Sequence, residues 1–152
     1  MQRKEKEIAD RAAMEEILQE TPVCRIAFAD NNEPYLIPVC FGYEKGAIYF
    51  HSALSGKKID MIQKNPRCCV EADMFEGPVR DENPCRWTMR YRSVICTGQA
   101  RILKSREEKC AAMNCILQHY GGPSSSFSLK SLEQVCLVQI AVEEMTGKQS
   151  GY

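Results

Sequence analysis

The chain has 152 residues, of which 44% are hydrophobic and 26% charged, a composition typical of globular proteins and unlike that of disordered or fibrous chains. Its length predicts one domain, residues 1–152, with enough buried surface to fold without disulfides. Twenty Lys and Arg residues balance twenty Asp and Glu residues, so the basic excess expected of a nucleic-acid-binding protein is missing.

Nothing in the sequence predicts a membrane or secreted protein. No apolar stretch approaches the about 20 residues that cross a bilayer, and residues 1–7 lack the apolar run of a signal peptide. The nine cysteines are an odd number without Cys-x-x-Cys spacing, which favours reduced thiols that act as packing residues, Cys96, Cys115 and Cys136 among them. We therefore expect a cytoplasmic protein with no metal site.

Helix signals come first along the chain. Asp10 is a suitable N-cap, and Met14, Ile17 and Leu18 follow at the spacing of one buried helical face. Pro22 ends this helix, because the residue before a proline disfavours the helical conformation.

Three strands are predicted next, at residues 23–29, 35–43 and 47–52. Polar turns at residues 30–34 and 44–46 separate them. Connections this short join antiparallel neighbours, so we predict an antiparallel meander.

Helices and strands alternate in the rest of the chain. The predicted elements are a helix from Ser55 to Asn65, a strand at 67–74, a loop at 76–84, a strand at 91–103, a helix from Ser105 to Gly121 that opens with a capping box, and a strand at 135–142. His119 falls on the polar side of its helix, where we expect it to be solvated. Trp87 either stacks on a planar ligand or covers the core.

These elements define a fold class. Six antiparallel strands with three interspersed helices exclude a doubly wound parallel sheet, which needs regular strand–helix alternation. A small closed barrel removes the exposed edges of such a sheet. We therefore predict a mainly β protein built on a six-stranded antiparallel barrel.

An anion site is indicated where the third strand ends. Ser52 closes that strand, and Lys57 and Lys58 open the following helix after a short loop. Helix N-termini carry free N–H groups and a positive dipole, which attract phosphate, and the hydroxyl and two ammonium groups add to this attraction. The alternative is a pair of solvated surface lysines.

Two further segments could serve a ligand. Pro38 lies between Ile37 and Val39 within a predicted strand, and because proline removes a ladder donor this position belongs at an edge, bulge or barrel opening. An ordinary edge strand is the alternative. Arg92 and Ser93 bring polar groups into an otherwise apolar strand.

As a set, several motifs resemble the pyridoxamine 5'-phosphate oxidase-like FMN-binding split barrels. They are the strand at 35–41, the run at 46–53, the helix start Gly56-Lys57-Lys58 and the helix stop Asn65-Pro66-Arg67. Residues 91–94, 98–101 and 142–148 look most like the nitroimidazole reductase-like, nitroimidazole-resistance branch. The resemblance runs from about residue 3 to residue 148.

This resemblance implies a homodimer of six-stranded Greek-key split barrels with two FMN sites at the subunit interface. It implies that backbone groups of Ile37, Pro38 and Val39 lie along the flavin ring, that Ser52, Lys57 and Lys58 hold the phosphate, and that Arg92, Ser93 and Val94 complete the cofactor site. His51 would lie near the flavin. The C-terminal Trp and Arg elements of the true oxidases are missing, so vitamin B6 oxidation is not expected.

His51 is the candidate catalytic residue. Strand alternation places Ile48 and Phe50 on the predicted core face and Tyr49 and His51 on the other. A histidine there can exchange a proton near neutral pH, as reduction of a nitro group requires. The alternative is a histidine satisfied by a backbone carbonyl.

The predicted function is that of an FMN-dependent oxidoreductase that reduces a small electron-poor substrate, with NAD(P)H as a candidate electron donor. FMN is expected instead of FAD, because the lysine-rich helix start suits a terminal phosphate and no residues for an adenylate pocket are evident. The alternatives are a non-catalytic flavin- or haem-binding store or sensor, and a metal- or thiol-based regulator.

Overall fold

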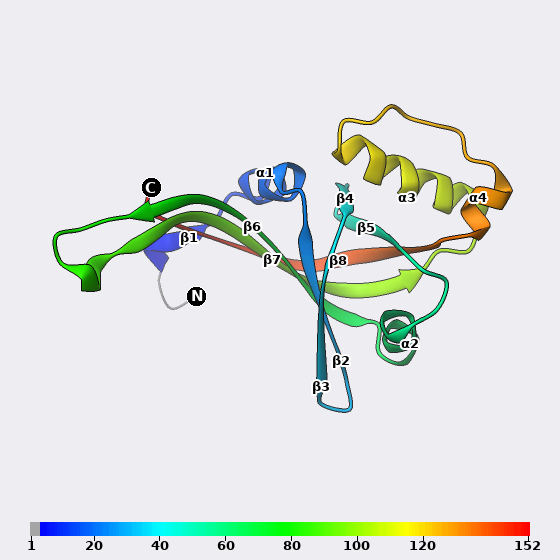
Figure 1. Ribbon diagram of the computed structural model, residues 1–152, viewed down its shortest axis with the longest axis horizontal. Helices are drawn as coiled ribbons and strands as arrows, with labels where there is room; N and C mark the ends of the chain where they lie inside the picture. Colours follow the sequence, from blue (N-terminus) through cyan, green and yellow to red (C-terminus); the bar gives the residue numbers. More distant parts are fainter. Residues whose placement is uncertain (1–3) are drawn as a thin grey trace.

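The computed structural model describes residues 4–152, so the first three residues of the segment in which we predicted no signal peptide lie outside the described residues. Long antiparallel strands dominate the fold, and helices lie around them (Figure 1). The main elements are β1 (Glu7–Ile8), α1 (Arg11–Glu20), β2 (Cys24–Asp30), β3 (Glu33–Val39), β4 (Phe41–Glu44), β5 (Ala47–Ser52), α2 (Lys57–Lys64), β6 (Arg67–Val79), β7 (Thr88–Ile102), α3 (Arg106–His119), α4 (Leu129–Glu133) and β8 (Cys136–Ser150). Short 3₁₀ turns lie at Lys4–Lys6 and Pro84–Arg86.

The strands form one antiparallel sheet in the order β3-β2-β6-β7-β8-β5-β4, with β1 paired to β8. The two ends of this path, β3 and β4, are consecutive in the chain and meet at Cys40. Their junction closes the sheet incompletely, which gives a split barrel and confirms the predicted fold class. The strand count is higher than the predicted six, because β1 is added and the strand predicted at 35–43 is divided.

The predicted three-stranded meander is confirmed in both of its antiparallel pairings, but its middle strand is divided at Cys40. β3 pairs with β2, and β4 pairs with β5, but β5 continues the sheet through β8. One stretch of chain thus borders two different partners, and it must turn at Cys40 to do so. The short turns at 30–34 and 44–46 indicated the two hairpins correctly, but they hold no information about which hairpins become neighbours.

The three longest strands extend beyond their predicted ends. β6 continues through a β-bulge between Phe75 and Gly77, so the first part of the loop predicted at 76–84 is strand. β7 begins at Thr88, and β8 runs on to Ser150. The β6–β7 hairpin therefore projects well past the barrel (Figure 1). Gly77, with φ of 127°, and Pro78 mark the bulge and not the end of a strand.

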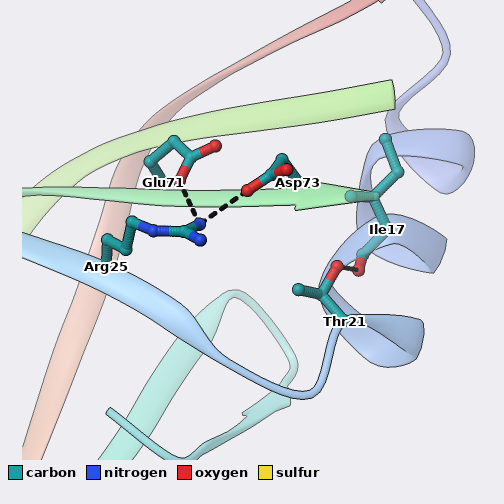
Figure 2. Close-up of polar contacts among 5 residues, drawn as sticks. All are labelled: Ile17, Thr21, Arg25, Glu71 and Asp73. Carbon is teal, nitrogen blue, oxygen red and sulfur yellow. Dashed lines mark hydrogen bonds and ion pairs between the residues drawn. The ribbon is translucent and has the colours of Figure 1, made fainter. Parts of the chain in front are cut away.

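The helix signals are largely confirmed. The Asp10 side chain accepts a hydrogen bond from Ala12 N, and the Ser105 capping box opens α3. At the end of α1 the buried Thr21 hydroxyl donates to Ile17 O at 2.6 Å (Figure 2). α4 is a short helix that we did not predict, and Ser128 caps it.

Two groups of apolar side chains are buried. The larger lies inside the barrel and includes Ile17, Ile26, Val94 and the predicted core pair Ile48 and Phe50. A smaller group lies between the barrel and α3, and its members are Leu103, Ala112, Ile116, Leu132 and Leu137. All nine cysteines are free thiols, and Cys96, Cys115 and Cys136 are buried as predicted.

Candidate functional site

The start of α2 has uncapped backbone N–H groups. Its N-cap is Gly56, with φ of 126° and no side-chain cap, whereas Asp10, Ser105 and Ser128 cap the other α-helices of the described chain. The first N–H groups of a helix need an acceptor. Those of Lys57 and Lys58 find none among the described residues, so this helix start retains its capacity to bind an anion.

Ser52 and Lys58 converge beside Cys136. Ser52 ends β5 directly opposite Cys136, the first residue of β8. Burial raises the pKa of the Cys136 thiol, while the positive charges of Lys109 and Lys58 lower it, so both ammonium groups act on the same thiol. A hydroxyl and two cations, from β5, α2 and α3, therefore gather at one end of the barrel. Lys109 was not predicted, since no local motif marks it.

Lys57 lies on the opposite side of the helix start. Its Nζ is 4.8 Å from the centroid of the Tyr35 ring on β3. It also lines a cavity of about 370 Å³ that includes the carboxylates of Asp30, Glu33 and Asp60. The two neighbouring lysines thus diverge: Lys58 lies on the Ser52 side, and Lys57 lies along β3.

β3 is an edge of the sheet path, which confirms the prediction made from Pro38. Pro38 is exposed, whereas Val39 is buried and Ile37 is half-buried. Their side chains lie opposite Arg25, Cys24 and Ile26, respectively. One side of β3 has no strand partner among residues 4–152, so its backbone groups are free to meet a ligand.

His51 is exposed at the end of β5, on the face that Tyr49 shares. The structure gives its ring no hydrogen-bond partner among the described residues. His119, by contrast, was predicted to be solvated, and this prediction is wrong. Its Nε2 lies 2.9 Å from Thr21 O, and its ring lies 4.6 Å from that of Phe41, because α3 packs this side of its C-terminus against β4.

Arg92, Ser93 and Val94 lie far from α2 within one chain. Val94 is fully buried in the core, and Arg92 lies 3.8 Å from Glu16 and 3.9 Å from Glu20 of α1. Ser93 pairs with Lys148 of β8, whereas Ser52 pairs with Cys136 at the other end of that strand. About 40 Å of strand separates the two positions at roughly 3.3 Å per residue. The structure therefore does not bring these two sets of predicted residues together.

The outer face of the sheet is partly apolar. Leu36, Phe75, Met89 and Ile95 are exposed on it or on its extension along the β6–β7 hairpin. Arg25 crosses this face and binds Glu71 at 3.1 Å and Asp73 at 2.6 Å (Figure 2). Desolvation raises the pKa of Glu71, although the hydrogen bond from Arg25 lowers it.

Trp87 covers no core. It lies in the loop of the β6–β7 hairpin, where its Nε1 donates to Asp81 O and the Arg80 guanidinium lies 5.5 Å from the ring centroid. The residue is 51% exposed. The core-covering alternative for Trp87 is therefore wrong.

Two other classes of site were sought in the part of the chain that the structure describes. No helix of residues 4–152 is both long and apolar enough to span a membrane. Within the same residues no three His, Cys, Asp or Glu side chains gather so as to hold a metal ion.

Comparisons with known proteins agree with the fold. A family model described as pyridoxamine 5'-phosphate oxidase matches residues 10–149. The crystal structure of a protein of Bacteroides thetaiotaomicron, provisionally named a 5-nitroimidazole antibiotic resistance protein, is 31% identical with a TM-score of 0.83, over 93% of this chain and 85% of that one. The FAD and haem binding protein of Mycobacterium smegmatis is 17% identical with a TM-score of 0.81, over 97% and 74% of the two chains. An uncharacterized protein of Rhizobium meliloti is 22% identical over 85 residues, and the match spans about half of that relative.

Proposed function

Because the chain belongs to the pyridoxamine 5'-phosphate oxidase family, we propose that it is a cytoplasmic flavoprotein that uses FMN to reduce a small electron-poor molecule. The observation that carries this proposal is the uncapped start of α2 with Ser52 and Lys58 beside it. The nitroimidazole name of the B. thetaiotaomicron relative supports the substrate class.

The residues present fit a flavin phosphate. A dianionic phosphate needs N–H and O–H donors with positive charge nearby, and Gly56, Ser52 and Lys58 supply an open helix start, a hydroxyl and an ammonium group. We propose that Lys57 helps to hold the phosphate from the β3 side. The free edge of β3 at Ile37, Pro38 and Val39 offers backbone groups to the polar rim of the ring.

When bound, the flavin would supply hydride and electron transfer, and the protein would bind, orient and shield it. His51 is the proposed proton donor or acceptor, because its ring is exposed at the strand end next to this site and has no protein partner among residues 4–152. A nicotinamide dinucleotide is the proposed electron donor.

We propose a homodimer in which the second copy completes the site. Ser52 and Ser93 pair with opposite ends of β8, so they lie far apart within one chain. They belong to one cofactor site only if Arg92, Ser93 and Val94 come from the partner. Since Val94 is buried, contact from that strand would come through Arg92, Ser93 and the backbone. The exposed Leu36 and Ile95 provide an apolar surface for such pairing.

A non-catalytic store or sensor is the second candidate, favoured by the name of the M. smegmatis protein, which binds FAD and haem. The absorption spectrum of freshly purified protein distinguishes flavin, haem and bare protein. Oxidation of NADPH or NADH by the flavin-loaded protein, with and without a nitroimidazole, then separates an enzyme from a store. A protein that binds no flavin at micromolar concentration contradicts the proposal.

A further inference from the structure

A second cationic cavity lies next to the proposed phosphate site. It lies between the first turns of α3 and the short helix α4, and its volume is about 210 Å³. Its lining consists of Lys104, Arg106, Lys109, Leu129, Leu132 and Glu133. Three cations and two leucines thus surround a space with only one carboxylate in its lining.

The three cations are not neutralised by neighbouring carboxylates. Among residues 4–152, Lys104, Arg106 and Lys109 form no ion pair, while the nearby Glu108 is occupied by Arg101 at 2.7 Å. The backbone at the start of α3 is already capped by Ser105. Any attraction for an anion therefore comes from the side-chain charges of the cavity and not from the helix terminus.

The cavity and the site at α2 have Lys109 in common. Lys109 lines the cavity, and its charge acts on the Cys136 thiol together with that of Lys58. A hydrogen bond from Leu103 N to Leu137 O fixes the end of β7 to the start of β8. The starts of α2 and α3 and helix α4 consequently gather at the same end of the barrel (Figure 1).

From this arrangement we infer that the α3–α4 cavity binds the phosphate-bearing adenosine part of a dinucleotide. Its cations suit a pyrophosphate or a ribose phosphate, and the half-exposed Leu129, beside the buried Leu132, offers an apolar surface to an adenine ring. The inference rests on the flavin-binding part of the proposed function, and tighter binding of FAD would replace FMN as the proposed cofactor. It provides the adenylate pocket that was not evident from the sequence. The adenosine part could belong to FAD, bound through Lys58 at its other end, or to an NADPH that approaches bound FMN.

Three titrations test this inference by calorimetry: FMN, FAD, and adenosine 2',5'-bisphosphate added to FMN-loaded protein. We expect either FAD to bind at least tenfold more tightly than FMN, or the bisphosphate to bind at submillimolar concentration. The first result identifies a flavin dinucleotide and the second a nicotinamide dinucleotide phosphate. The double variant Lys104→Gln, Arg106→Gln should weaken the responding ligand about tenfold or more and leave the dissociation constant of FMN within twofold.

Lys130→Gln is the matched control, because Lys130 is an exposed cation of α4 outside the cavity lining. If FAD has no advantage and the bisphosphate does not bind, the inference is wrong even where FMN binds well. Equal weakening of FMN by the double variant also overturns it. If no flavin binds at all, the bisphosphate is titrated against the flavin-free protein. Binding of the bisphosphate then supports the cavity inference even though the proposed function has failed, and absence of binding overturns both.

Discussion

Lys57 and Lys58 are neighbours in the sequence, yet their ammonium groups lie in different surroundings. Lys58 acts on Cys136 opposite Ser52, and Lys57 lies over the Tyr35 ring beside three carboxylates. Two adjacent lysines at a helix start can therefore act on different groups. A charge that faces an anion site contributes more to binding than one already surrounded by carboxylates.

Lys58→Ala should weaken FMN binding by about 1.5–3 kcal/mol, the usual contribution of a hydrogen bond to a charged group. Lys57→Ala should weaken it by less, because that ammonium group is shared with the Tyr35 ring and the acidic cavity. Quenching of FMN fluorescence gives both dissociation constants. Lys64→Ala, at the far end of α2, is the control, and unchanged affinity in both test variants would remove the phosphate assignment.

His51→Ala should lower reductase turnover at least tenfold and flatten its pH dependence, while FMN affinity changes little. The reason is that the exposed imidazole at the end of β5 is the proposed proton donor or acceptor for the reaction. Steady-state kinetics across pH 5 to 9 measure this. Should turnover and its pH profile survive while only the melting temperature falls, His51 has a structural role.

At the scale of single elements, the barrel strands bury several thiols that the core holds in the neutral form. Burial raises the pKa values of Cys24, Cys68 and Cys96 from 9.0 to about 12. In the unfolded chain these thiols ionise at their ordinary pKa, so above pH 9 the unfolded state loses protons that the folded state keeps. Their contribution to stability is complete below pH 9 and is lost as the pH rises toward 12.

The free energy of unfolding should therefore fall with pH in this window, by about 1.4 kcal/mol per pH unit for each buried thiol. Urea unfolding at pH 8, 9 and 10 measures the slope. Cys96→Val, of similar size, should reduce that slope by the share of one thiol, whereas Cys85→Val, at an exposed position, should not change it. Identical slopes in the wild-type and Cys96→Val proteins contradict the assignment.

The elements differ in how well the sequence predicts them. Features that depend on neighbouring residues are predicted well, and features that depend on packing between distant segments are not. β5 has its predicted bounds because apolar alternation and turn residues define it locally, and the caps of α1 and α3 depend on residues within one turn. The break at Cys40, by contrast, depends on which strands lie on either side of it. The place of Lys109 in the site likewise depends on the packing of α3 against β8, which no local pattern records.

At the scale of the whole molecule, the proposed site needs two chains. Ser52, proposed to bind the phosphate, lies opposite the first residue of β8, while Arg92 and Ser93 lie toward the other end of that strand. The fold could thus be predicted within one chain, and the residues proposed to hold the phosphate lie near one another in it. The residues of the complete proposed site could not be predicted in this way, because no sequence pattern indicates which residues face a partner subunit.

Ile95→Glu should convert a dimer into a monomer and weaken flavin binding at least tenfold, because a charge would replace a 45% exposed apolar side chain on the outer face of β7. Light scattering gives the mass, and fluorescence gives the affinity. Ala111→Glu, on the exposed side of α3, is the matched control and should remain a dimer.

Mixing two defective variants tests the shared site directly. Lys58→Glu and Ser93→Glu should each bind flavin poorly, yet in a mixture whose subunits exchange, part of the binding should return, since mixed dimers hold one site without either substitution. A flavin-loaded monomer in the wild-type protein, or a mixture that regains nothing, refutes the two-chain site.

The pairing of β8 also constrains how the chain acquires its fold. β4 and β5 join the sheet only through β8, which follows every other element in the chain. While the polypeptide is being synthesised, the β4–β5 hairpin has no strand partner in the sheet until residues 136–141 have left the ribosome. Pairings this distant in sequence form slowly. The nascent chain therefore holds an incomplete barrel with open edges until this central strand has been synthesised.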